Sequence, residues 1–218
     1  MGVGRQSSVT YVIGCLKVAL GEDAVIRYNQ PGNQGAVMIN LGGIDAAAFR
    51  YINTELASPV MDKVMLDATT LGVGVVQAGL SLACIMWGWI GERVNIRRAG
   101  YAGLTAFALS GIAVQIAKHL WDRPRPLLAM YDVRVVGESL FVHSFPSGHT
   151  TTAFAVAVAI SIFLPKLRWV LIPFAFITGL SRVYLGVHFP LDVLYGGLIG
   201  TLIGIWAAAL VQRPCRTQ

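Results

Sequence analysis

Five long apolar runs separated by short polar connections constrain this chain more than any other feature. They occupy residues 71–90, 99–118, 149–164, 169–187 and 191–211. A helix needs about 20 apolar residues to cross a bilayer, and in lipid the chain must satisfy its backbone hydrogen bonds internally. The runs therefore predict an all-α integral membrane bundle, with five transmembrane helices forming a core over residues 71–212.

The composition supports a membrane protein. Hydrophobic residues make up 55% of the 218 residues and charged residues only 13%, which is about half the usual charged share of a soluble domain. The net charge is +6, but the basic residues fall between the apolar runs and form no single patch, so a nucleic-acid partner is not predicted. Cys15, Cys84 and Cys215 are far apart, so neither a disulfide framework nor a metal-ligand spacing is predicted.

The basic residues predict how the bundle is oriented. Short basic connections at 92–98 and 165–168, and the basic tail at 213–218, all follow or precede the same ends of the runs. Such loops mark the cytoplasmic side of a membrane. The loop at 119–147 and the turn at 186–192 are then expected to face outward.

The first 70 residues form a separate N-terminal region in this interpretation. The apolar run Val9–Leu20 is too short for a comfortable crossing, and it would be a sixth span if it crossed. Residues 21–43 are predicted to be loop. Residues 44–66 predict one or two amphipathic helices interrupted at Pro59. These helices either lie at the membrane surface or pack against the bundle.

Small residues recur every four positions in the last apolar run, at Gly196, Gly200, Gly204 and Ala208. This spacing favours close approach of a neighbouring helix. The alternative is the ordinary enrichment of glycine in membrane helices.

Three polar clusters interrupt the apolar chain, and all lie on the predicted outer side. They are Lys118–Pro126, Pro146–His149 and Ser181–Asp192. A single cation or histidine at a span end usually has only a surface role. Charged groups gathered at one end of a membrane bundle are instead candidates for function.

The clusters contain the groups that bind an oxyanion. Lys118, Arg125 and Arg182 are cations that can converge on one anion, and arginine suits the geometry of phosphate oxygens. Ser147 is a candidate N-cap, and the backbone N–H of Gly148 adds a donor at a helix start, which favours an anion. These residues predict a phosphate site.

The clusters also contain groups for covalent chemistry. His188 and Asp192 are four residues apart, and Pro190 can begin a helix between them. The carboxylate can then fix one imidazole nitrogen and leave the other free to attack. His149 can supply a proton to a leaving group. No His or carboxylate cluster has metal-ligand spacing, so no metal and no cofactor is predicted.

The three motifs together resemble those of a known family. The spacings K-x6-R-P, P-S-G-H and S-R-x5-H-x3-D are similar to those of the type-2 phosphatidic acid phosphatase superfamily. Its members are integral membrane lipid phosphatases, with soluble acid phosphatases and vanadium haloperoxidases as relatives. The resemblance covers about residues 60–212. Membrane members usually have six spans; the N-terminus would be outside with five spans and inside with six.

The resemblance implies a role for each site residue. His188 would be the nucleophile that forms a phosphohistidine, Asp192 would orient it, and His149 would protonate the leaving group. The phosphoryl oxygens would be held by Lys118, Arg125, Ser147, Gly148 and Arg182. Fixed cations would take the place of a metal in stabilising the transition state.

The expected function is therefore a lipid phosphatase at the outer, periplasmic face of a bacterial cytoplasmic (inner) membrane. Candidate substrates are undecaprenyl diphosphate, phosphatidylglycerophosphate and phosphatidate, and the motifs select none of them. A lipid phosphotransferase would use the same intermediate. Two other classes are a transporter or channel, in which the cations form a selectivity site, and a vanadate-dependent haloperoxidase, which would be soluble.

Overall fold

The computed structural model describes residues 41–212. The predicted run Val9–Leu20 and the predicted tail at 213–218 lie outside the described residues. Within that range the regular elements are all helical, and the all-α membrane class predicted from the sequence is confirmed. The main helices of the bundle are α4 (Gly74–Ile90), α5 (Val94–Leu120), α7 (Gly148–Phe163), α8 (Arg168–Tyr184) and α9 (Pro190–Gln212).

Each predicted apolar run corresponds to one of these helices. By length and composition α5 and α9 can each cross a membrane, and so can α3 (Pro59–Thr70) with α4 as a pair bent by 52°. Helix α7 is apolar but shorter, so the number of crossings stays a prediction. Helix α5 begins at Val94, and most of the connection predicted at 92–98 is therefore helical.

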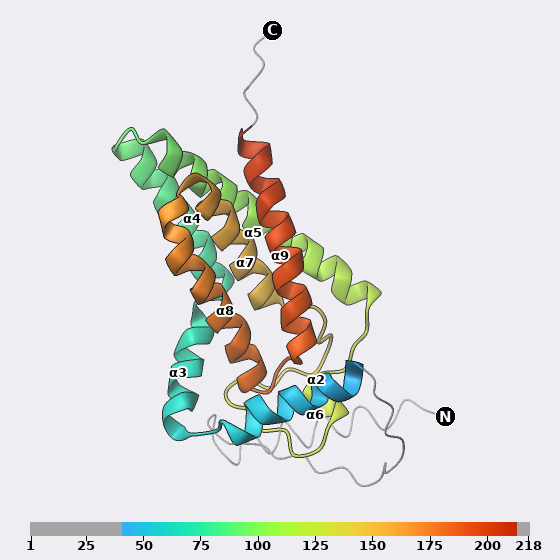
Figure 1. Cartoon of the computed structure of the whole chain (residues 1–218). Coiled ribbons are helices and arrows are strands. Elements are labelled where there is room, and N and C mark those ends of the chain that lie inside the picture. Colours follow the sequence, from blue (N-terminus) through green and yellow to red (C-terminus); the bar gives the residue numbers. More distant parts are fainter. Residues whose placement is uncertain (1–40, 213–218) are drawn as a thin grey trace.

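Helix α7 is the centre of the bundle and packs against α4, α5, α8 and α9 (Figure 1). Its residues from Thr150 to Ala157 are all buried, and most of them are small. Small side chains allow the neighbouring helices to approach its backbone closely. Because α7 carries the Pro-Ser-Gly-His motif at its start, that motif is fixed at the centre of one end of the bundle.

The described part of the N-terminal region lies across that same end of the bundle with its first helix and continues up the side of the bundle (Figure 1). It contains α2 (Leu41–Arg50), a π-helical turn η1 (Tyr51–Glu55) and α3. The loop predicted at 21–43 is thus wrong at its last residues, because α2 begins at Leu41. The predicted interruption at Pro59 falls at the start of α3, where the Met61 N–H donates to the Ser58 hydroxyl at 3.2 Å.

The region packs against the bundle, which was one of the two predicted arrangements. Phe49 is buried and its ring lies 5.5 Å from that of Phe189. The Asn53 amide is fully buried and donates to the carbonyl oxygens of Arg134 and Tyr184, at 2.7 and 2.8 Å. A buried amide with all these partners fixes the position of the segment.

The repeated small residues of α9 face α7. A Cβ on Gly196 would lie 3.0 Å from the Ser147 carbonyl oxygen. A Cβ on Gly204 would lie closer than van der Waals contact to the carbonyl oxygen of Ala155. A Cβ on Gly200 would overlap the carbonyl oxygen of Thr151. The spacing therefore serves close packing of α9 on α7.

We expect Gly200→Ala to destabilise the protein. The added methyl group must push α9 away from the α7 backbone, and overpacking of this kind costs about 1–3 kcal/mol. The melting temperature of the detergent-purified protein measures the effect. Gly111→Ala is the matched control, because Gly111 lies inside α5 with nothing near its Cβ position. Equal melting temperatures for the two variants would contradict this account of the packing.

Candidate active site

The three polar clusters meet at one end of the bundle. The C-terminal ends of α5 and α8 and the N-terminal ends of α7 and α9 lie together there (Figure 1). A cavity of about 370 Å³ opens between them. Of the residues predicted from the sequence, it is lined by Lys118, Arg125, Gly148, His149, Arg182 and His188. Ser147 and Asp192 are fully buried beside this cavity.

The loop after α6 (Pro126–Ala129) supplies part of the lining that the sequence did not predict. Leu140, Phe141, Val142 and His143 line the cavity together with Gln115. Gln115 could have been found, because it is three residues before Lys118 and therefore on the same face of α5. The loop residues form no pattern in the sequence, and only the fold brings them to the site.

His188 lies in the turn between α8 and α9 and is only 2% exposed. Its Nδ1 lies 3.7 Å from Oδ2 of Asp192, which is an ion-pair contact longer than a hydrogen bond. Its Nε2 lies 3.4 Å from Nη1 of Arg125. The carboxylate is thus on the Nδ1 side of the ring, and Nε2 faces the cation.

The position of Asp192 follows from local helix chemistry. Pro190 is the first residue of α9, and it needs no hydrogen-bond partner for its backbone nitrogen. Asp192 is the third residue, and its Oδ2 accepts the N–H of Phe189 at 2.9 Å. This is the reach-back contact of a capping box. The helix start therefore directs the carboxylate toward the turn that holds His188.

Two further donors hold the same carboxylate. Nη1 of Arg123 donates to Oδ1 of Asp192 at 2.5 Å, and the Ser144 hydroxyl donates to Oδ2. Neither Arg123 nor Ser144 was predicted as a site residue. Arg123 belongs to the Arg-Pro-Arg-Pro segment of the first cluster, so its type was visible but its partner was not.

Burial lowers the pKa of His188 to about 4. The Asp192 carboxylate opposes the shift by favouring the charged imidazolium, and the charges of Arg125 and Arg182 add to it. A histidine with this pKa is neutral at pH 7. A nucleophile must have a free lone pair, so the environment leaves His188 in the form that can attack.

Arg125 is held mostly by backbone carbonyls. It is 4% exposed, and it donates to Val142 O and Val187 O at 2.8 Å and to His143 O at 3.3 Å. Arg125 thereby connects the loop that lines the cavity to the turn that contains His188. Arg125 also contributes its positive charge to the lining of the cavity.

Arg182 is held differently. Its Nη1 donates to the Thr69 hydroxyl at 2.7 Å, and its buried Nε has no hydrogen-bond partner within residues 41–212. No carboxylate is among the lining residues of the described cavity. A lining with three cations, an unpaired donor and no carboxylate is typical of an anion site.

Ser147 differs from its prediction in one respect. It occupies the N-cap position of α7, but its side chain accepts no backbone N–H of that helix. Its hydroxyl instead accepts from Thr150 at 2.9 Å, and its backbone N–H donates to Asp192 O at 3.1 Å. Its role in the described structure is to join α7 to α9. Its predicted contact with phosphate stays a proposal.

His149 is the second residue of α7, and its ring lies against the break between α3 and α4. A Cβ on Gly72 would be 3.0 Å from Cβ of His149 and would overlap Thr178. Only a residue without a side chain fits at this point.

Among residues 41–212 no three His, Cys, Asp or Glu side chains are grouped as metal ligands would be.

The fold and the cavity together define a helical membrane protein with a cation-lined cavity beside a buried histidine at one end. The sequence then gives the family. Residues 100–215 match the model of the PAP2 superfamily, and the chain belongs to that superfamily. This confirms the family predicted from the motifs.

Two of the relatives are phosphatases of lipids by name. The chain is 30% identical over 145 residues to undecaprenyl-diphosphatase BcrC of Bacillus subtilis (strain 168), covering 66% of this chain and 72% of the relative. It is 32% identical over 166 residues to phosphatidylglycerophosphatase B of the same strain, covering 68% and 74%. These relatives confirm the predicted enzyme class, a lipid phosphatase.

One solved structure matches nearly the whole chain. The crystal structure of a transmembrane PAP2-type phosphatidylglycerolphosphate phosphatase from Bacillus subtilis superimposes with a TM-score of 0.67. The match covers 97% of this chain and 98% of that one, at 24% identity. At this identity the likeness shows a common fold.

Because His188 is buried, we expect the folded protein to lose stability in mild acid. Its pKa is about 4 in the folded protein and about 6.5 in the unfolded chain. Between these values the unfolded chain binds more protons, so stability falls as the pH is lowered from about 6.5 to about 4, by roughly 3 kcal/mol in total.

We therefore expect the melting temperature of His188→Asn to fall less than that of the wild type between about pH 7 and about pH 4.5. Both proteins would be compared in the same detergent. His119→Asn is the matched control, because the His119 side chain is exposed. A fall in His188→Asn as large as in the wild type would contradict the burial effect.

Proposed function

We propose that this protein hydrolyses a lipid phosphate monoester or diphosphate through a phosphohistidine at His188. The observation that carries the proposal is the placement of His188. Its Nδ1 faces a carboxylate, its Nε2 faces Arg125, and it lines a cavity rich in cations and free of carboxylates. This is the arrangement that a neutral nucleophile attacking an anionic phosphorus requires.

In the first step the phosphoryl group is held by the site's donors. These are Lys118, Arg125 and Arg182 and the backbone N–H of Gly148 at the start of α7. Nε2 of His188 attacks phosphorus and forms the N–P bond while the bond to the leaving oxygen breaks. His149 donates a proton to that oxygen, and Asp192 stabilises the imidazolium that forms.

In the second step water attacks the phosphohistidine. His149, now deprotonated, takes the proton of the water as the new O–P bond forms. The N–P bond breaks, the electron pair returns to Nε2, and inorganic phosphate leaves. Both histidines are then in their starting states, and the fixed cations have balanced the phosphoryl charge throughout.

The basic connections of the bundle support a site on the outer side of the membrane. The connections with Arg93, Lys166 and Arg168 lie at the end opposite the cavity (Figure 1). Short basic connections favour the cytoplasm. We therefore place the site at the outer, periplasmic face of a bacterial cytoplasmic membrane.

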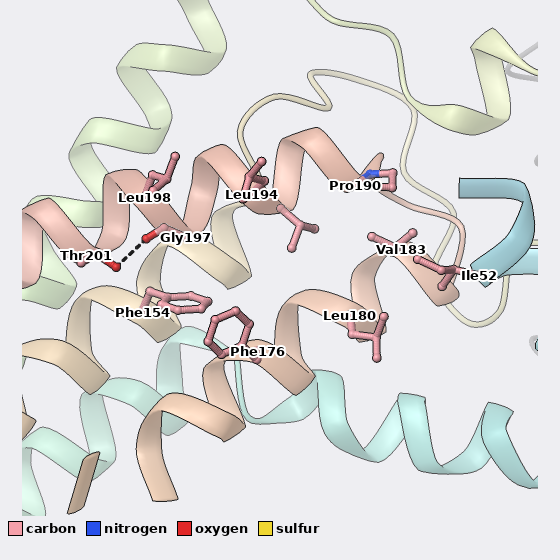
Figure 2. Close-up of a pocket in the computed structure, with 11 residues that line it drawn as sticks. Ile52, Phe154, Phe176, Leu180, Val183, Pro190, Leu194, Gly197, Leu198 and Thr201 are labelled. Carbon is pink, nitrogen blue, oxygen red and sulfur yellow. Dashed lines mark hydrogen bonds between the residues drawn. The ribbon is translucent and has the colours of Figure 1, made fainter. Parts of the chain in front are cut away.

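An apolar groove supports a substrate with a hydrocarbon chain. It has a volume of about 400 Å³ and lies between α8 and α9 (Figure 2). Phe154 and Phe176 form its floor, with ring centroids 4.9 Å apart. Its one hydroxyl, on Thr201, is bonded within its own helix to Gly197 O at 2.8 Å. The lining of the groove therefore has no unpaired side-chain hydroxyl, and a hydrocarbon chain can lie there without breaking a hydrogen bond.

The residues at the outer end of the groove are close in sequence to residues that line the cavity. This end is formed by Val183 and Pro190, which directly follow Arg182 and closely follow His188. We propose that one hydrocarbon chain of the substrate rests in the groove. By the names of the relatives, the candidate substrates are undecaprenyl diphosphate and phosphatidylglycerophosphate.

We expect His188→Ala to lower phosphate release by about a thousandfold or more, because it removes the nucleophile. The assay would use the detergent-purified protein, a panel of lipid phosphates and diphosphates, and excess EDTA. Full activity of the wild type in EDTA is expected, since fixed cations do the work of a metal.

The outcomes separate the alternatives. Equal activity of wild type and His188→Ala would overturn the proposal, and activity lost in EDTA but restored by Mg²⁺ would overturn the mechanism. Acid-labile labelling of the wild type, absent in His188→Ala, would support the phosphohistidine. Transfer to an added lipid alcohol with no release of phosphate would make the protein a phosphotransferase.

We expect Leu198→Trp to weaken the use of long-chain substrates. The larger ring fills the groove and displaces two or so methylene groups, and at about 0.8 kcal/mol each this raises KM by roughly tenfold. A water-soluble phosphate ester without a chain should be used equally well. Leu202→Trp is the matched control, because Leu202 is exposed on the same helix outside the groove. Equal KM values for the two variants would exclude the groove as a chain site.

A further inference from the structure

Arg123 joins the carboxylate of the site to a second buried carboxylate far away in the chain. Its Nη1 donates to Oδ1 of Asp192 and its Nη2 to Oδ2 of Asp45, each at 2.5 Å. Asp45 belongs to α2, and Asp192 to α9. The side chains of Asp45 and Asp192 are 1% and 0% exposed. Buried charges this close together are costly unless each is paired.

Asp45 is also bonded to the helix that carries Asp192. Its Oδ1 accepts the N–H of Leu191 at 2.8 Å, and Leu191 is the residue just before Asp192. The Arg123 guanidinium lies over the ring of Phe189, 4.4 Å from its centroid. Asp45 and Arg123 are therefore held from several sides against the first turn of α9.

Neither Asp45 nor Arg123 lines the cavity. Each can reach the reaction only through Asp192. Arg123 takes Oδ1, while Oδ2 faces Nδ1 of His188. The arginine thus determines which carboxylate oxygen is presented to the histidine.

Charge explains why a second carboxylate is needed. Arg123 alone would neutralise Asp192, and a neutralised Asp192 would stabilise the imidazolium of His188 weakly. Asp45 shares the arginine, so the three groups together carry one net negative charge. That charge remains available to His188 when Nε2 attacks phosphorus. Interactions between buried charges are weakly screened, so a change at Asp45 is felt at the ring.

We propose that Asp45 and Arg123 are positioning residues that orient Asp192 and keep it negatively charged toward His188. Helix α2 is then a working part of the active site, although it lies outside the catalytic motifs. The inference rests on the proposed function, because it assumes that His188 is the nucleophile and that Asp192 assists it.

Asp45→Asn tests the inference. The amide keeps the size of the side chain and an oxygen for the Leu191 N–H, but it removes the charge. We expect kcat to fall about tenfold, equivalent to about 1.4 kcal/mol, with KM and the melting temperature close to those of the wild type. Asp45→Glu, which restores the charge, should recover part of the loss.

A double-variant cycle with Arg123→Gln shows whether Asp45 acts through the arginine. In the Arg123→Gln background, Asp45→Asn should cause no further loss of kcat, because the positive charge that Asp45 offsets is gone. Asp67→Asn is the matched control, since Asp67 is an exposed carboxylate on α3. It should leave kcat unchanged.

The outcomes separate the inference from the proposed function. An active His188→Ala, measured in parallel, overturns the proposed function whatever Asp45→Asn does. An inactive His188→Ala with wild-type kcat in Asp45→Asn overturns only the inference. Additive losses in the double variant overturn it as well. So does a fall in kcat that Asp45→Glu fails to recover and that accompanies a lower melting temperature.

Discussion

The carboxylate of Asp192 is the group on which the outer end of this protein depends. It caps α9 through the Phe189 N–H, accepts Arg123 and Ser144, and faces His188. Each contact alone contributes modestly, but a buried carboxylate without such partners would be protonated or would unfold its surroundings. The same contacts that satisfy the charge also fix the histidine turn. The same carboxylate therefore both stabilises the start of α9 and orients His188.

That arrangement is possible because α7 and α9 approach closely. The glycines of α9 lie against carbonyl oxygens of α7, and the Ser147 N–H reaches the Asp192 carbonyl. A bundle with larger side chains at this contact would separate the two helices by an ångström or more, of the order that costs catalytic geometry heavily. Close packing in the middle of the bundle thus positions His149 and Asp192 at its end.

The sequence predicted the helices and the motif residues well, because both follow from local patterns. Apolar run length locates helices in lipid, and the polar exceptions to those runs included all three lining cations. The burial of the Ser147 side chain, the lining loop at 140–143 and the partner of Arg123 were not predictable. Each depends on which segments meet in space, and Asp45 is 78 residues from Arg123. From the sequence, a lone aspartate in an amphipathic helix is predicted to face solvent, and only the fold shows that it is buried.

The charges at this end of the bundle form two separate compartments of opposite sign, one on each side of the His188 ring. Behind the histidine, Arg123 is shared by two carboxylates, so this group is negative, and each carboxylate oxygen accepts a hydrogen bond. In front of it, the hydrogen-bond partners of Arg125 and Arg182 are uncharged, and Nε of Arg182 has none within the described chain. An unpaired buried donor costs about 1–3 kcal/mol, a cost that an incoming phosphoryl oxygen would remove. The neutral ring of His188 stands between the two compartments, with a negative charge at Nδ1 and positive charges near Nε2. This polarity favours attack by Nε2 on an anion and opposes the reverse orientation of the ring.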